Sequence, residues 1–282
     1  MLLKQVMKSF GLLAIGWATL VSGHAQLSVS LESTRDTFLL YEPMEFNVRL
    51  QNLTGSPIAL QDHPVHKRSW LSFQIFGSSG EKIGPTGNGS LPPQVLKPGE
   101  SKTLQVNITP LYKIRSTGQY DIRANVNIAG GQSFITGSIR INVGKGEVTW
   151  VRDINVDGVK RTYSLIRFLD QSKSSLYLRV EEVDKNLVYS TTRLGEIVGF
   201  TTPDVKFDSD GKIHLLHVST SALHRYSRLT RNGILEYQED RQVAGMAPAL
   251  IETDDGGVQL AGGFNTRKQV KRKKLSEDQM GL

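Results

Sequence analysis

The 282-residue sequence contains no cysteine. Disulfide bonds are therefore excluded, as are the thiolate ligands of zinc sites and the thiolate nucleophiles of cysteine enzymes. Each domain must be stable through its hydrophobic core alone. For an exported chain, this composition is more typical of a bacterial envelope or secreted protein than of an animal extracellular one.

The sequence also lacks the motifs of common enzymes. It has no Gly-x-Ser-x-Gly nucleophile elbow. Its glycine-rich segment 84–89 leads into Leu91-Pro92-Pro93 and not into a helix, so a phosphate loop is excluded. The carboxylate pairs Asp208/Asp210 and Asp254/Asp255 fall in turn motifs, where aspartate is favoured for turn geometry. We therefore predict a protein that is not an enzyme and needs no cofactor.

Residues 1–25 have the pattern of a secretory signal peptide. Lys4 and Lys8 form a basic region, and the apolar run 10–21 follows it. Small residues at positions 23 and 25 predict cleavage near Ala25, which would give a secreted, periplasmic or cell-envelope protein. The alternative is a retained membrane anchor, but the run is shorter than the ~20 residues of a spanning helix. No later stretch is long and apolar enough to span.

The net charge of +7 comes from the two ends of the chain. The leader carries +2, and the tail 265–282 carries six basic residues against two acidic ones, or +4, which leaves +1 for the middle. A basic face that would bind nucleic acid is therefore not indicated. We expect the tail to be disordered. Weak contact of this tail with an anionic surface is an alternative role.

Residues 26–144 are predicted to form an immunoglobulin-like β-sandwich. Apolar and polar side chains alternate in segment after segment, which is the pattern of strands with one buried face. The alternating sets are Leu27/Val29/Leu31, Met44/Phe46/Val48/Leu50, Leu71/Phe73/Ile75, Leu104/Val106/Ile108, Tyr120/Ile122/Ala124/Val126/Ile128 and Ile135/Ile139/Ile141/Val143. No segment here has a helical period. About seven short strands with turns between them are typical of this sandwich.

Local motifs within residues 37–128 add a family resemblance. They are the strand 46–52 with Ser56-Pro57-Ile58 after it, the turn 80–83, the sequence Leu96-Lys97-Pro98-Gly99-Glu100, and the strand start 118–124. Their order resembles bacterial immunoglobulin-like domains, in particular the intracellular proteinase inhibitor family of bacilli. The resemblance implies this fold, and it makes protease inhibition an alternative function. Tyr120, which opens a late strand, resembles a tyrosine corner.

Residues 147–264 are strand-rich and repetitive. The clearest unit runs from Pro203 through the turn 208–211, two strands and the turn 230–233 to Glu239. Parts of it recur earlier and later in the chain. Four strands in about 40–45 residues are typical of a propeller blade. We predict two to three blade-like repeats, too few for a closed propeller. The blades could stack as a small sandwich, close by oligomerisation, or have their edges covered by the first domain.

Residues 153–158 (DINVDG) match the start of a calcium loop. Asp153, Asn155 and Asp157 would supply oxygen ligands at alternate positions. The twelfth position, which should be Glu or Asp, is Ser164, and the flanking segments have strand patterns. The alternative is a β-hairpin turn built on Asp157-Gly158.

Two histidine pairs and one tryptophan are the remaining candidates. His63 and His66 share a loop, where they could converge on zinc or, with Trp70, form a surface recognition site. His214 and His217 lie three apart on a strand and so point to opposite faces. Ordinary histidines, and a core position for Trp70, are the alternatives.

The leading functional hypothesis is an exported, non-enzymatic binding or scaffolding protein. Its partner would be a protein, a peptide or a glycan, bound by sandwich loops or by a sheet edge. An oligomer is compatible with the unfinished blade repeats. The alternatives are a protease inhibitor and a hydrolase with a pocket at His214, Asp204 or Asp208.

Overall fold

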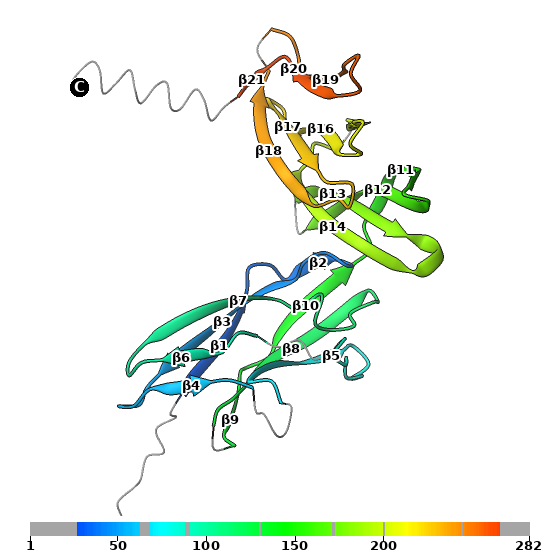
Figure 1. The fold of residues 1–282 in the computed structure, drawn as a ribbon. Coiled ribbons are helices and arrows are strands. Elements are labelled where there is room, and N and C mark those ends of the chain that lie inside the picture. Colours follow the sequence, from blue (N-terminus) through cyan, green and yellow to red (C-terminus); the bar gives the residue numbers. More distant parts are fainter. Residues whose placement is uncertain are drawn as a thin grey trace, which may run out of the picture.

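The chain is all-β, as the alternation predicts. The computed structural model describes residues 27–62, 68–87, 91–129, 131–170, 173–199, 201–243 and 245–265 (Figure 1). They form 21 strands and one short 3-10 helix, η1 (Val183–Lys185). Within these ranges no helix has the length and apolar character needed to cross a membrane. The leader and the tail after Asn265 lie outside the described residues.

The N-terminal part, here called the sandwich, contains two main sheets. One sheet has the order β1-β3-β7 and consists of β1 (Leu27–Ser33), β3 (Glu45–Asn52) and β7 (Ser101–Asn107). The other has the order β2-β10-β8-β5 and consists of β2 (Thr37–Leu39), β10 (Ile139–Gly144), β8 (Gly118–Asn127) and β5 (Leu71–Gly77), with β9 (Ser133–Ile135) also paired to β8. A short pair, β4 (Ile58–Leu60) and β6 (Gln94–Leu96), completes this part.

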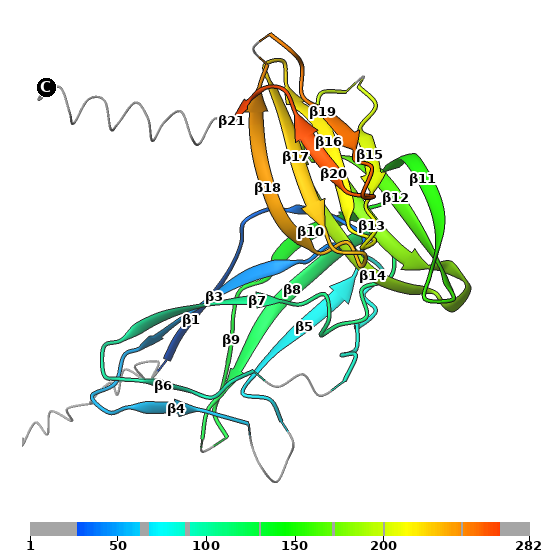
Figure 2. The same cartoon turned by 45° about the horizontal axis from the view of Figure 1, so that its top comes forward.

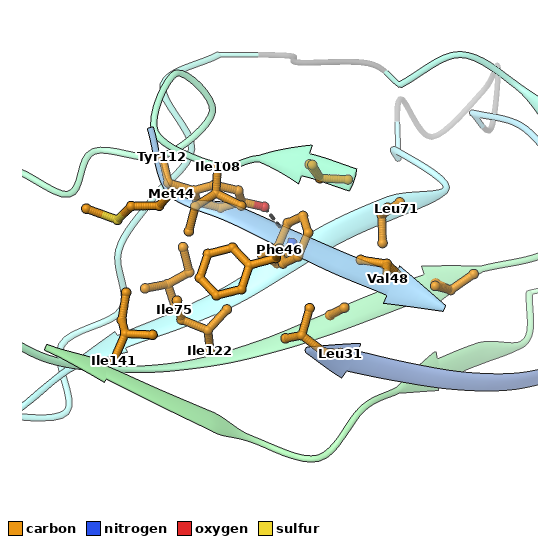
Figure 3. Close-up of a cluster of buried hydrophobic side chains, with 14 of the residues drawn as sticks. Leu31, Met44, Phe46, Val48, Leu71, Ile75, Ile108, Tyr112, Ile122 and Ile141 are labelled. Carbon is orange, nitrogen blue, oxygen red and sulfur yellow. Dashed lines mark hydrogen bonds between the residues drawn. The ribbon is translucent and has the colours of Figure 1, made fainter. Parts of the chain in front are cut away.

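The sandwich core is made of the alternating apolar residues. On β3, Phe46, Val48 and Leu50 are fully buried. Figure 3 shows Phe46 pointing toward Ile75 and Ile122 of the opposite sheet. A slip of one residue in β3 would turn its polar side chains into this core, so the burial fixes the register.

Two tyrosines tie loops to the sandwich. The Tyr120 hydroxyl donates to the backbone oxygen of Ser116 at 2.8 Å, which confirms the predicted tyrosine corner. The Phe73 N–H donates to the Tyr112 hydroxyl at 2.6 Å (Figure 3). This second bond holds the segment after β7, residues 108–115, against β5.

The C-terminal part contains two four-stranded antiparallel meanders and a hairpin. The first blade consists of β11 (Glu147–Val156), β12 (Val159–Asp170), β13 (Lys173–Glu182) and β14 (Leu187–Glu196), paired in that order. The second blade consists of β15 (Asp204–Phe207), β16 (Ile213–Thr220), β17 (Leu223–Leu229) and β18 (Leu235–Gln242), with β21 (Phe264–Asn265) paired to β18. The third unit is the hairpin of β19 (Ala249–Glu252) and β20 (Val258–Ala261). The predicted two to three blade-like repeats are confirmed.

These units stack face to face (Figure 2). Side chains such as Leu178 of the first blade and Leu215 of the second form the core between the two blades. Leu216 and Tyr226, on the second blade, pack against Leu250 of the hairpin. The sheets thus bury their apolar faces as successive propeller blades do, with no closed ring among the described residues.

The sandwich packs on part of the other face of the first blade. Leu39 at the end of β2 is fully buried against Ile166, Phe168 and Tyr177. Of the three arrangements left open by the sequence, the structure combines stacking with cover from the first domain. The surface that packs against Leu39 is a sheet face, whereas the option left open by the sequence was cover of a sheet edge.

A buried ion pair lies beside this contact. The Glu42 carboxylate is 2 % exposed and accepts bonds from Arg35 Nη2 (2.9 Å) and the Leu39 N–H (2.6 Å). Arg35 Nη1 also donates to the Tyr177 hydroxyl at 3.2 Å. Burial, together with the Glu42 charge, raises the pKa of Tyr177 to about 12. These bonds join β2 to β13, so they fix the sandwich relative to the first blade.

Candidate functional site

Trp70 is a core residue, which corrects its prediction as a surface recognition residue. Its side chain is 1 % exposed, and Nε1 donates to the Leu91 backbone oxygen at 3.2 Å. The indole therefore has its polar atom satisfied inside the fold. His63 and His66, its predicted companions, lie outside the described residues.

The calcium-loop motif lies in the β11–β12 hairpin. Val156 pairs with Val159, and the two turn residues Asp157 and Gly158 have φ of 52° and 79°. Positive φ at both turn residues is the signature of a type I′ turn. The structure thus has the hairpin that was the alternative interpretation.

The three candidate calcium ligands are not brought together in this hairpin. Asp153 pairs with Lys160 (2.8 Å) and Thr162 (2.7 Å), while Asp157 pairs with Arg231 (2.8 Å). Among the described residues, no three histidine or carboxylate side chains are placed to hold a metal ion.

His214 is buried with both ring nitrogens engaged. Nε2 lies 3.0 Å from Asp208 Oδ2, and Nδ1 lies 2.8 Å from the Tyr226 hydroxyl. Although burial opposes it, hydrogen bonds from His214 and Lys212 lower the pKa of Asp208. A His-Asp pair of this kind could serve a hydrolase, but this imidazole has no nitrogen left for a nucleophile. Its bonds link β16 to the turn after β15 and to β17.

A cleft lies between the sandwich and the blades. Its volume is about 700 Å³. One wall comes from the sandwich and comprises Tyr41, Pro43, Thr86, Asn107, Thr109, Pro110, Tyr112, Lys113, Ile114 and Arg115. The opposite wall comprises Asn186, Leu187, Val188, Tyr189, Ser190, Thr191, Thr192 and Ile234. We call this the interdomain cleft.

The interdomain cleft follows the edge of β14. Every residue from Asn186 to Thr192 lines it. Successive side chains of a strand point to opposite faces, so a cleft that touches all of them runs along the backbone edge. β14 pairs with β13, and no other described strand pairs with its outer side. Figure 1 shows this edge turned toward the sandwich.

Local structure holds both walls. On the sandwich side, the Thr86 N–H donates to the Leu111 oxygen and the Lys113 N–H to the Gly84 oxygen. On the blade side, η1 is followed by Asn186, whose φ of 50° leads the chain into β14. A left-handed conformation of this kind is well tolerated by asparagine. The walls are therefore tied to the rest of the fold on both sides.

The charged side chains in the described lining of the interdomain cleft are all basic. Lys113 and Arg115 are exposed in its lining, which contains no carboxylate. The Arg161 guanidinium lies 4.5 Å from the ring centre of Tyr189, and that of Arg179 lies 5.2 Å from the ring centre of Tyr41. Such an arrangement favours an anionic ligand group.

The lining offers groups that could bind a polar ligand. It contains hydroxyl, amide and cationic side chains but neither an imidazole nor a carboxylate that could act as a general base. Sequence reasoning missed this site. The strand pattern of residues 187–196 was readable, but the strand order that leaves β14 at an edge was not.

A second, smaller cavity of about 310 Å³ lies at the other end of β14. It is lined by Arg193, Gly195, Glu196, Ser219, Thr220, Leu223 and Arg225. Arg225 is bound to Asp240 by two bonds of 2.7 and 2.9 Å, and Lys173 pairs with Glu196. Two of its three charged residues, Glu196 and Arg225, are thus already paired, so this cavity is the weaker candidate.

Comparisons with known proteins give no family. No protein-family model matches the chain, and no curated protein matches it. Among solved structures, the sporulation control protein Spo0M of Bacillus subtilis is 10 % identical with a TM-score of 0.28, over 58 % of this chain and 83 % of that one. The Salmonella enterica SafA pilin–SafB chaperone complex is 10 % identical with a TM-score of 0.24, over 77 % and 96 %. The YadV chaperone is 12 % identical with a TM-score of 0.23, over 86 % and 100 %. Scores this low support no functional argument.

Proposed function

We propose that this protein is an exported, non-enzymatic binding protein that holds an extended segment of a partner protein against β14. The observation that supports it is the course of the interdomain cleft along six consecutive residues of β14, Leu187 to Thr192, at an edge with which no other described strand pairs. An extended peptide there would receive main-chain hydrogen bonds from β14, and the two walls would contact its side chains.

The surroundings of β14 leave space for an added strand from a partner peptide. Exposed strand edges promote aggregation, and proteins usually cover or charge them. Here the sandwich wall shelters the edge and leaves room beside it. A strand added in this space would satisfy backbone groups that otherwise face solvent.

Export is supported by the leader pattern of residues 1–25. We expect the protein purified from its own cells to begin at Gln26 and to be found outside the cytoplasm. N-terminal sequencing combined with cell fractionation measures both. An intact leader on a cytosolic protein would remove this part of the proposal.

Binding along β14 can be tested with a display library of short unstructured peptides. We expect the selected peptides to protect alternate backbone amides within residues 187–192 from hydrogen exchange, because an added strand bonds to the amides that face away from β13. Protection confined to other strands, or a failure to select any binder, would contradict strand addition.

Methylation of the peptide backbone gives a sharper readout. Each methyl group removes one N–H donor, and alternate donors of an added strand face β14. We expect affinity to fall at every second position and to be retained at the positions between. A uniform response along the peptide, or a glycan that binds the interdomain cleft where peptides fail, would overturn the proposal.

A further inference from the structure

We propose that the interdomain cleft selects partner segments in which acidic and apolar side chains alternate. This inference rests on the proposed strand addition and specifies its ligand class. A strand added to β14 would continue the pleat of the sheet. Its side chains would therefore point alternately toward the sandwich and toward the second blade.

The register of β14 assigns its two faces. Thr191 lies opposite Arg179, whose Nη2 donates to the Leu40 oxygen at 2.5 Å, so this face meets the sandwich. Ser190 lies opposite Val180, and its hydroxyl donates to the Asn232 oxygen at 2.6 Å. That face meets the turn of the second blade.

The sandwich side of the interdomain cleft is cationic. Lys113 and Arg115 stand two positions apart, are exposed, and have no carboxylate beside them in the lining. A nearby carboxylate outside the lining, Glu182, is already held by Lys185 at 2.7 Å and by the Tyr189 hydroxyl at 3.0 Å. The positive charges of Lys113 and Arg115 are complementary to acidic side chains of a ligand.

The blade side of the interdomain cleft is apolar. Leu187 is 45 % exposed and Ile234 is 53 % exposed, and both line it. Leu187 lies opposite Glu182, on the same face as Val180, and Ile234 follows Gly233, whose oxygen accepts a bond from the Thr192 hydroxyl at 2.6 Å. Exposed aliphatic side chains on this side would gain contacts from apolar residues of the ligand.

The two sides together require alternation, which a matched pair of peptides can test. One peptide alternates Glu and Ile; the other has the same composition arranged as a Glu block followed by an Ile block. We expect the alternating peptide to bind the full-length protein at least about tenfold more tightly, because only it presents each residue type to its own wall. Its affinity should also fall as salt is added, since Lys113 and Arg115 are exposed.

A pair of double variants isolates the cationic wall. Lys113→Gln with Arg115→Gln should weaken the alternating peptide by roughly tenfold, at about threefold for each exposed charge pair. Arg49→Gln with Lys97→Gln removes the same net charge from exposed positions outside the cleft lining. This control should leave the affinity unchanged.

The outcomes separate the two proposals. If both peptides protect β14 from hydrogen exchange with equal affinity, or if the two double variants behave alike, the alternation rule is wrong while strand addition stands. If neither peptide protects β14 and the selected library peptides also fail to do so, strand addition fails and the ligand class fails with it.

Discussion

His217 is an imidazole that the fold keeps neutral. It is 2 % exposed, and Nε2 donates to the Glu196 backbone oxygen at 3.1 Å. Nδ1 has no hydrogen-bond partner among the described residues. Burial lowers the pKa of His217 from 6.5 to about 4, against the opposing effect of the Glu196 bond. The residue lies where the two blades meet, so its protonation state affects their packing.

The depressed pKa of His217 predicts acid sensitivity. Between pH 6.5 and 4 the unfolded chain binds a proton at this residue and the folded chain does not, so the free energy of unfolding falls as the pH falls. The expected loss from His217 is about 3 kcal/mol. Urea unfolding of the wild type and of His217→Gln, from pH 8 to pH 4, measures it. The difference between the two proteins should be constant near pH 8 and shrink in acid; a difference that does not depend on pH would assign the acid sensitivity to other groups.

The turn of the β11–β12 hairpin tests whether a positive φ requires glycine at position 158. Its two turn residues both have positive φ, a conformation that favours glycine at position 158. We expect Gly158→Ala to lower the free energy of unfolding by about 1 kcal/mol because alanine is strained there. Asp157→Asn is the matched control, since asparagine tolerates this conformation.

The same hairpin should not respond to calcium. Asp153 and Asp157 are paired with basic side chains. Added CaCl₂ or EDTA should therefore leave the melting temperatures of the wild type, of Gly158→Ala and of Asp157→Asn unchanged. A rise in melting temperature with calcium that Asp153→Asn abolishes would restore the calcium-loop interpretation.

Strand identity was readable from the sequence because it depends on near neighbours. The alternation in β3 and the Asp157-Gly158 turn are local features, and the structure has both. Strand order is different, because the position of β14 at a sheet edge depends on which distant segments pair. Trp70 shows the same limit: its sequence neighbourhood resembles a polar loop, while its side chain packs in the sandwich core and bonds to the distant Leu91.

At the scale of the whole molecule, the sandwich and the first blade share one small apolar cluster. Leu39 packs on Ile166, Phe168 and Tyr177, and the Arg35–Glu42 pair lies beside it. No local pattern in the sequence marks Leu39 as a contact between domains, since it resembles any other buried strand residue. This cluster, together with the bonds of Arg35 to Tyr177 and of Arg179 to Leu40, holds the two domains that form the walls of the interdomain cleft.

The cluster predicts that peptide binding depends on a residue outside the interdomain cleft. Leu39→Ala should cost about 3 kcal/mol through the cavity it leaves. Leu60→Ala, also fully buried but within the sandwich core, should have a similar cost. Only Leu39→Ala removes packing between the domains, so only this variant should split calorimetric unfolding into two transitions and weaken the peptide selected on the wild type. If Leu39→Ala splits the unfolding into two transitions but leaves the peptide affinity unchanged, β14 binds without the sandwich wall, and the cationic wall at Lys113 and Arg115 has no part in recognition. If the two variants unfold with equal cooperativity, the apolar cluster at Leu39 is not what couples the domains.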